Sequence, residues 1–148
     1  MNHTVDVPAE PSPFPLVAGK TALIVIDMQR DFLLPGGFGE SLGKDVGQLL
    51  KVVPPLAELI AACRAAGVMV IHTREGHRPD LSDLPANKRW RSERAGAEIG
   101  SVGPCGRILV RGEPGWEIVP EVAPLPGEPV IDKPGKGAFY ATDLDLVL

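Results

Sequence analysis

The sequence predicts an α/β fold with a mainly parallel sheet, and three observations support this prediction. Continuous apolar runs rich in β-branched residues lie at 21–26 and 68–71, and a segment with helical apolar spacing separates them. A third apolar run follows at 129–131. Continuous apolar runs are typical of strands buried on both faces, which occur in parallel sheets. A strand, a helix and a second strand at this spacing form a βαβ unit with a right-handed crossover.

Composition sets limits on the class of protein. The chain has 148 residues and a net charge of -4, a size that fits one domain. The acidic balance argues against nucleic acid or an anionic membrane surface as a partner, because both bind strongly basic faces. No apolar run approaches the roughly 20 residues that span a bilayer. The N-terminus also lacks the basic start and apolar core of a signal peptide, so we expect a cytoplasmic protein.

Residues 1–20 predict an extended N-terminal arm. This stretch is rich in proline and shows neither a helical nor a strand period. Such a composition favours an extended segment, and we expect it to pack on a neighbouring subunit. The rest of the chain, residues 21–148, forms the predicted α/β domain.

The helix between the first two strands has clear boundaries. Asp45, with Gln48 three residues later, has the spacing of a capping box. The main helix is expected to start at Pro54, since proline is tolerated in the first turn, and to end at Gly67. Its apolar face is formed by residues at helical spacing, namely Leu56, Leu59, Ile60 and Cys63.

The C-terminal half gives weaker signals. Residues 73–128 are rich in Arg, Gly and Pro, and 108–110 is a candidate short strand. The third core strand should end near Asp132. Thr142 then has the character of an N-cap, with acidic residues following it in the first turn. This helix stops at Leu148 after about two turns, so we expect a sheet that is incomplete at the C-terminus.

Two ionisable residues follow predicted strands, where α/β sheets bind their ligands. Asp27 follows the first strand and Lys133 follows the third. Because the carboxyl ends of parallel strands meet at one edge, these side chains can converge and carry acid–base chemistry. A loop cap for Asp27 and a surface charge for Lys133 are the alternatives, and spacing alone does not choose between them.

Two segments resemble the motifs of isochorismatase-like cysteine hydrolases. They are VIDMQRDF at 25–32 and VIDKPGKGAFYATDLDLVL at 130–148. The resemblance implies a Rossmann-like three-layer sandwich and an Asp, Lys and Cys triad. Matching motif to motif places the aspartate at Asp27 and the lysine at Lys133, with Asp31 as a second, more structural acid. Lys136 is the rival lysine, but the Ala138–Phe139 pair fits the family spacing better after Lys133.

The segments between the two motifs resemble the biuret and triuret hydrolase branch. They span 72–100 and 103–116. The resemblance implies hydrolysis of a C–N bond in a small ureido or amide compound by a homo-oligomer, without a cofactor. In that mechanism Asp27 takes the thiol proton, Lys133 stabilises the thiolate, ammonia leaves and water releases the acyl or carbamoyl enzyme. Phe32 and Glu75 are the expected substrate-binding residues.

The sequence departs from this family at the nucleophile. The family cysteine lies at the start of a helix after a fourth strand, which this sequence does not reach. Cys63 lies on the apolar face of a helix, and Cys105 lies in a Gly-Pro-Cys-Gly turn, so neither is expected to be catalytic. We therefore expect the N-terminal portion of such an enzyme, inactive on its own. A non-catalytic domain that binds a ligand or partner, or one half of a split enzyme, are the alternatives.

Two further groups of residues have more than one candidate role. His72 and His77 lie where some relatives hold a metal, but the Asp-x-His pattern of those relatives is absent, so we expect no metal. A basic run surrounds Trp90, and a solvated or subunit-contacting face is the expected role. The run consists of Lys88, Arg89, Arg91 and Arg94.

Overall fold

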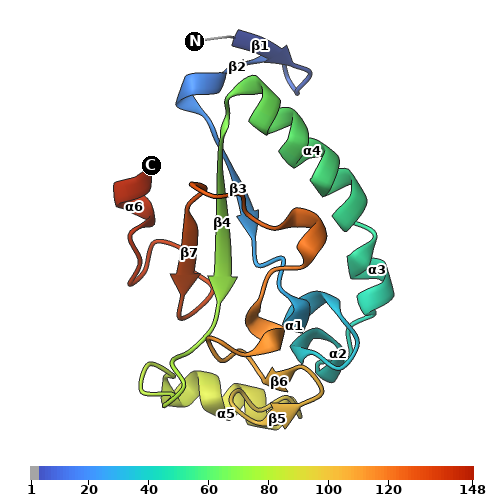
Figure 1. Cartoon of the computed structure of the whole chain (residues 1–148), viewed down its shortest axis with the longest axis vertical. Helices are drawn as coiled ribbons and strands as arrows, with labels where there is room; N and C mark the ends of the chain where they lie inside the picture. Colours follow the sequence, from blue (N-terminus) through green and yellow to red (C-terminus); the bar gives the residue numbers. More distant parts are fainter. Residues whose placement is uncertain (1–3) are drawn as a thin grey trace.

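The computed structural model describes residues 4–148 and confirms the α/β class. Its central sheet has three parallel strands in the order β3–β4–β7 (Figure 1). These strands are β3 (Ala22–Ile26), β4 (Met69–Glu75) and β7 (Val130–Lys133). The second and third strands both extend further than their apolar runs, because polar residues at their carboxyl ends continue the ladder. All three strands therefore end at the same edge of the sheet.

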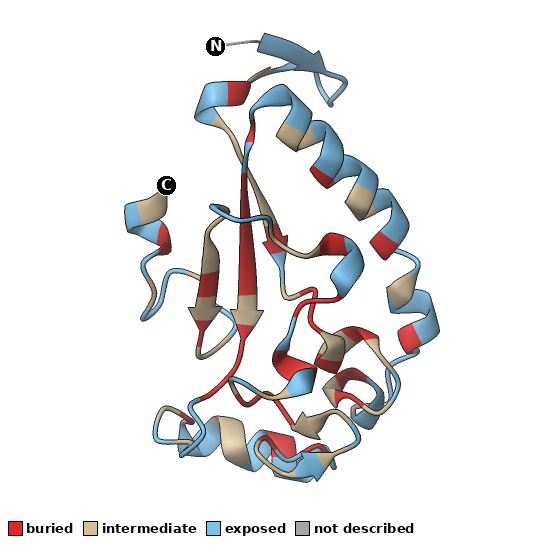
Figure 2. Cartoon of the chain, in the orientation of Figure 1, coloured by how far each residue is buried: buried red, intermediate tan, exposed pale blue. Residues whose placement is uncertain are grey.

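Helices cover both faces of the sheet, as expected for a layered α/β fold. On one face, Val25 and Val70 pack against Ile60 of α4 (Val53–Ala66) and against η3 (Pro120–Val122). On the other face, Ile71 and Ile131 pack against a short C-terminal helix, α6 (Leu144–Val147). Figure 2 shows this burial concentrated in β4 and in the loops below it.

The predicted helix boundaries are confirmed to within one residue, since α4 begins at Val53 and not at Pro54. A short helix, α3 (Val46–Leu50), begins after Asp45, whose Oδ1 accepts a hydrogen bond from the Gln48 N–H at 3.2 Å. Helix α4 carries prolines in its first turn and ends at Gly67, which adopts the left-handed conformation with φ 72°. Glycine is favoured there because it lacks a Cβ.

The segment Val46–Ala66 departs from one expectation. By length and composition alone it is apolar enough to cross a membrane, although the sequence predicted no such run. The prolines at the start of α4 interrupt the segment, and Val53 and Ile60 are buried against the core. A helix that covers a sheet gives the same composition signal, so this one is weak evidence for a membrane.

The N-terminal arm has more structure than its composition indicated. Two strands, the exposed β1 (Thr4–Val7) and the partly buried β2 (Phe14–Val17), pair antiparallel as a hairpin, and a 3-10 turn, η1 (Ala18–Lys20), leads into β3. Proline residues fall mainly in the connection, so the strands keep their backbone pairing. Residues 1–3 of the predicted arm lie outside the described part of the chain.

The region between β4 and β7 contains short elements around the carboxyl edge of the sheet. The candidate strand at 108–110 is wrong: Ile108 and Leu109 lie in a buried turn, and Leu109 has φ 50°. The Asp31 carboxylate accepts the Leu109 N–H in this turn, and within the segment Val110 alone forms a β-bridge, an isolated parallel one with His77. The elements near this edge are α1 (Arg30–Leu33), α2 (Phe38–Ser41), α5 (Ala86–Arg94), β5 (Val102–Gly103), β6 (Gly106–Arg107) and η2 (Pro114–Trp116).

The last helix begins slightly later than predicted. Asp143, rather than Thr142, occupies the N-cap of α6. The Thr142 hydroxyl still accepts a hydrogen bond from the Leu144 N–H at 3.3 Å and donates to the Ala138 carbonyl. Thr142 therefore still contacts the first turn of α6, although it precedes the N-cap by one residue.

Candidate active site

Asp27 and Lys133 meet at the carboxyl edge of the sheet. Lys133 Nζ donates to Asp27 Oδ2 at 2.6 Å. The lysine is almost fully buried and the aspartate side chain is 19% exposed. Because burying an ammonium group costs free energy, Lys133 requires a well-placed carboxylate partner, and Asp27 provides it. The arrangement is a buried ion pair with one partner open to solvent.

The backbone of Asp27 turns its side chain over the neighbouring strand. Its φ is 53°, an uncommon value for a residue other than glycine. The Asp27 N–H donates to Thr73 on β4, and the Thr73 hydroxyl donates to Asp27 Oδ1 at 2.7 Å. Both carboxylate oxygens therefore have fixed donors, one from Thr73 and one from Lys133.

Glu75, at the end of β4, bridges two lysines. Its Oε2 lies 3.4 Å from Lys133 Nζ and its Oε1 lies 2.7 Å from Lys88 Nζ. Burial favours a higher pKa for this carboxyl group, but the two ammonium groups outweigh burial and hold its pKa below the ordinary value. Glu75 is therefore held as a carboxylate within an alternating row of charges that starts at Asp27.

Lys88 is a site residue that the sequence did not reveal. Its Nζ donates to Glu75 at 2.7 Å, to His77 Nε2 at 2.8 Å and to the Pro134 carbonyl at 3.0 Å. The expected role, as part of a solvated basic run, is wrong for this residue. The sequence did carry one sign of this buried role. The helical spacing of Lys88, Ser92 and Ala95 places the lysine on the least charged face of α5, where burial is expected.

The two histidines contact other side chains of the protein. His77 accepts from Lys88 through Nε2, so its Nδ1–H faces Asp83 Oδ1 at 3.3 Å. Burial and then the charge of Lys88 lower the pKa of His77. His72 lies inside β4, not in a loop, and contacts Glu128. Within residues 4–148 no three His, Cys, Asp or Glu side chains are grouped to hold a metal ion.

Gln29 and Asp31 of the first motif fasten the surrounding loops. The fully buried Gln29 amide donates to the Glu75 and Trp116 carbonyls at 2.9 Å, and its oxygen accepts the Glu75 N–H at 2.7 Å. Asp31 Oδ2 accepts the Leu109 N–H at 2.8 Å. The sequence indicated a structural acid at Asp31 but gave no sign of the role of Gln29.

Phe32 lies on α1 between two apolar clusters. It packs in a T-shaped contact on Phe38, with ring centroids 5.9 Å apart. Phe38, and not Phe32, lines the cavity next to Glu75. Contact of Phe32 with a substrate therefore stays a prediction.

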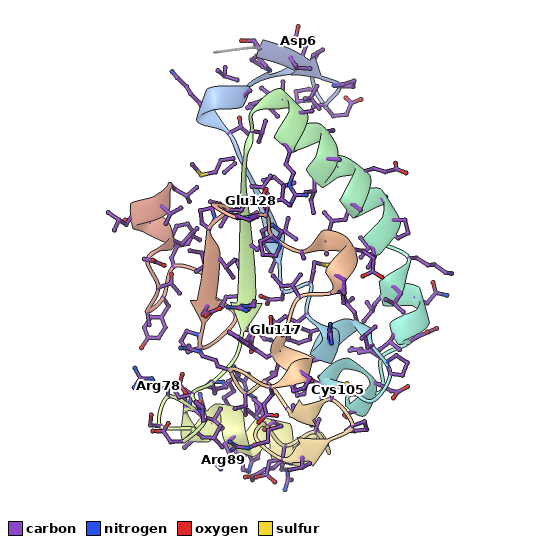
Figure 3. All side chains as sticks on the ribbon, viewed as in Figure 1. Asp6, Arg78, Arg89, Cys105, Glu117 and Glu128 are labelled. Atoms are coloured by element: carbon purple, nitrogen blue, oxygen red, sulfur yellow. The ribbon has the colours of Figure 1, made fainter. Side chains whose placement is uncertain are left out.

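The two cysteines lie away from the Asp27–Lys133 pair. Cys63 is half-buried on α4 and packs on the core. Cys105 lies in the turn between β5 and β6, where Figure 3 labels it, and its Sγ contacts the Pro35 carbonyl at 3.7 Å. Burial, then the negative charge of Asp31, raises the pKa of the Cys105 thiol. A raised pKa leaves less thiolate for nucleophilic attack.

Residues 21–148 match the isochorismatase domain. The chain belongs to the isochorismatase family. It is 31% identical over 147 residues to the ureidoacrylate amidohydrolase RutB of Azorhizobium caulinodans, covering 96% of this chain and 64% of that protein. It is 33% identical over 152 residues to a RutB of Methylorubrum extorquens, covering 97% of this chain and 59% of that protein.

Solved structures of family members have the same fold. A cysteine hydrolase from Pseudomonas syringae superposes with a TM-score of 0.70 at 31% identity, covering 91% of this chain and 56% of that chain. An isochorismatase family protein from Desulfovibrio vulgaris superposes with a TM-score of 0.65 at 37% identity, covering 86% and 60%. The 148 residues thus span about three fifths of the length of these relatives. Two of the relatives are named as amidohydrolases.

Proposed function

We propose that this chain supplies the acid–base residues of a cysteine amidohydrolase that cleaves C–N bonds in small ureido or amide compounds. The observation that carries the proposal is the 2.6 Å contact between Lys133 Nζ and Asp27 Oδ2 at the carboxyl edge of the sheet. Membership of the isochorismatase family and the hydrolase names of the relatives support the reaction class.

In the proposed reaction, Asp27 is the general base and Lys133 is its electrostatic partner. Asp27 accepts the proton of a cysteine thiol, and the thiolate attacks the carbonyl carbon of the substrate. The C–N bond then breaks as the leaving nitrogen takes that proton from Asp27. Water attacks the resulting thioester or thiocarbamate, again giving a proton to Asp27, and the thiol returns. Thr73 and Lys133 keep the carboxylate oriented through both steps.

The nucleophile in this proposal is neither Cys63 nor Cys105. Within the described residues neither thiol contacts Asp27 or Lys133, and one packs on the core while the other has a raised pKa. We therefore propose that the thiol comes from a segment outside these 148 residues, on the same or a second chain. The 148 residues alone are then inactive.

The proposed substrate class has three candidate members, which are biuret, triuret and ureidoacrylate. The segments 72–100 and 103–116 resemble biuret and triuret hydrolases, whereas the relatives found by comparison are named for ureidoacrylate. Glu75 lies at the junction of the ion pair and the cavity, where it can accept a hydrogen bond from a ureido N–H. A cytoplasmic homo-oligomer remains part of the proposal.

The test uses the protein expressed from its own gene and isolated intact. Its mass is measured, and ammonia release is assayed with biuret, triuret and ureidoacrylate. We expect Asp27→Asn to lower the rate at least about a hundredfold, in the range of a lost general base. Asp45→Asn is the matched control, because asparagine caps a helix as well as aspartate does. Alkylation with iodoacetamide, followed by peptide mapping, then identifies the reactive thiol.

Two results would contradict the proposal. One is full activity of Asp27→Asn, which would remove the base from the mechanism. The other is loss of activity upon alkylation of Cys63 or Cys105 alone, which would place the nucleophile inside these residues.

A further inference from the structure

Two cavities at the carboxyl edge of the sheet share the same three cations. One, of about 260 Å³, is lined by Phe38, Glu75 and the inner face of α5. The other, of about 560 Å³, lies between α5 and the segment 134–141. Both are lined by Lys88, Arg91 and Lys136. A concentration of positive charge is unexpected in a chain whose net charge is -4.

The acidic side chains that line these cavities are already matched by cations. Glu75 bridges Lys88 and Lys133, and Asp83 lies 3.6 Å from Arg111 and next to His77. Their charges are therefore largely neutralised from the protein side. They do not offset additional positive charge in the cavity.

Arg91 and Lys136 differ from Lys88 in having open charges. Lys88 is held by three partners, but for the other two cations no ion pair or side-chain hydrogen bond exists within residues 4–148. Arg91 comes from α5 and Lys136 from the loop after β7, so they approach the cavities from two different elements. Two unpaired cations facing one hollow next to Glu75 favour an anionic ligand over a neutral one.

We infer that Arg91 and Lys136 bind the carboxylate of the substrate, so that the preferred substrate is a small ureido acid and not an uncharged ureide such as biuret. This inference rests on the proposed function, because it places the ureido group of the same molecule toward Asp27 and Lys133. An arginine can bind a carboxylate through two parallel N–H donors, while lysine adds a point charge. In this arrangement the carboxylate fixes the molecule at one end, and the ureido group is directed toward Glu75, which lines the smaller cavity and lies 3.4 Å from Lys133 Nζ.

The test measures binding by calorimetry, without turnover, using the full chain at low ionic strength. The probes are N-carbamoylglycine, its uncharged amide N-carbamoylglycinamide, and biuret. We expect the carboxylate probe to bind at least tenfold more tightly than either neutral probe. Arg91→Gln and Lys136→Gln should each weaken binding of the carboxylate probe by roughly tenfold, the effect of one lost charged hydrogen bond. Raising the salt concentration should weaken it further.

The matched control is Arg89→Gln, which removes an arginine from the same helix without changing a residue that lines either cavity. It should leave the preference for the carboxylate unchanged. Equal binding of charged and neutral probes, no binding of any probe, or a preference that survives both Arg91→Gln and Lys136→Gln would each overturn the inference.

The inference and the proposed function fail in different ways. If the intact protein binds N-carbamoylglycine through Arg91 and Lys136 but Asp27→Asn has full activity, only the proposed mechanism is lost. If the intact protein hydrolyses biuret faster than any ureido acid and Arg91→Gln changes nothing, the mechanism stands and the carboxylate site is lost.

Discussion

Lys133 Nζ lies 2.6 Å from Asp27 Oδ2 although the whole width of β4 separates the strands that carry them. Two features make this contact possible. The left-handed backbone of Asp27 turns the carboxylate over the end of β4, where Thr73 holds it, and the buried lysine stem runs along the end of β7. The ion pair therefore depends on the strand order β3–β4–β7 as well as on the charges of the two side chains.

Replacing Lys133 by methionine should destabilise the fold strongly. Removing one partner of a buried pair leaves an uncompensated charge, which costs about 3–5 kcal/mol. The double variant Asp27→Asn with Lys133→Met should lose less than the sum of the single variants, because it leaves no unpaired Asp27. Urea unfolding followed by circular dichroism measures both.

Lys136→Met is the control for this comparison. Lys136 is exposed and has no ion-pair partner among the described residues, so its loss should change the free energy of unfolding by less than about 0.5 kcal/mol. Equal effects of Lys133→Met and Lys136→Met would mean that the buried contact does not exist.

Replacing Lys88 by methionine should raise the pKa of Glu75. Burial alone favours a higher pKa for this carboxyl group, and Lys88 is the larger of the two cationic influences that lower it. The measurement is an NMR titration of the Glu75 side chain with ¹³C-labelled glutamate, which requires no activity. We expect a shift of at least about one unit, the size usual for a nearby opposite charge. Arg89→Met should leave the titration unchanged.

The fold should lose stability in acid, with a defined contribution from Glu128 at the amino end of β7 (Figure 3). Its hydrogen bonds with Arg64, 2.7 and 2.8 Å long, lower its pKa from 4.5 to about 2 against the opposing effect of burial. Because the folded pKa is lower, this stability is fully present above pH 4.5 and is lost as pH falls toward 2. A tenfold change in proton affinity is worth about 1.4 kcal/mol, so the full shift corresponds to about 3.5 kcal/mol. Solvent screening of the partly exposed Arg64–Glu128 pair lowers the expected contribution to roughly 2–3 kcal/mol.

His72 adds to the same acid sensitivity at higher pH. Burial lowers the pKa of its imidazole below the ordinary 6.5, although its Nε2–H donates to Glu128. Protons therefore bind the unfolded chain first as pH falls below 6.5, and stability declines from that point.

Thermal unfolding measured from pH 7 to pH 2 should show a shallower acid decline for Glu128→Gln than for the wild type. Glu58→Gln, on the exposed side of α4, should follow the wild type; identical slopes for all three would refute the assignment.

The sequence predicted those parts of the fold that depend on local chemistry. The Asp45 cap, the Gly67 stop and the three parallel strands follow from capping, left-handed glycine and continuous apolar runs, all of which act over a few residues. Burial on both faces was predicted for all three strands, but β3 lies at the edge of the sheet and is only partly buried. Asp27 and Lys133 were placed at strand ends that share one edge of a parallel sheet, and the structure brings them into contact. Their catalytic role came from the resemblance to the family motifs and stays a prediction.

The residues that were missed depend on distant partners. Gln29 has no local pattern, since its amide is satisfied by the backbone of Glu75 and Trp116. Lys88 looked solvated because arginines surround it in sequence, yet its partners lie on β4 and after β7. The turn at 108–110 has strand-like residues, but a carboxylate from α1 holds Leu109 at a positive φ that strands do not adopt, and Val110 alone bridges to His77.

Replacing Gly115 by alanine should destabilise the loop next to the site, because its added Cβ would overlap the Asp31 carboxylate. Asp31 cannot move aside easily, because its side chain is buried and its Oδ2 is held by the Leu109 N–H. Overpacking of this kind costs about 1–3 kcal/mol. Gly137→Ala is the matched control, since no atom lies within 4 Å of its Cβ position and it adopts no positive φ, so it should be neutral or slightly stabilising. Urea unfolding of the two variants decides the matter, because equal stabilities would show that the Asp31 carboxylate is not fixed against Gly115.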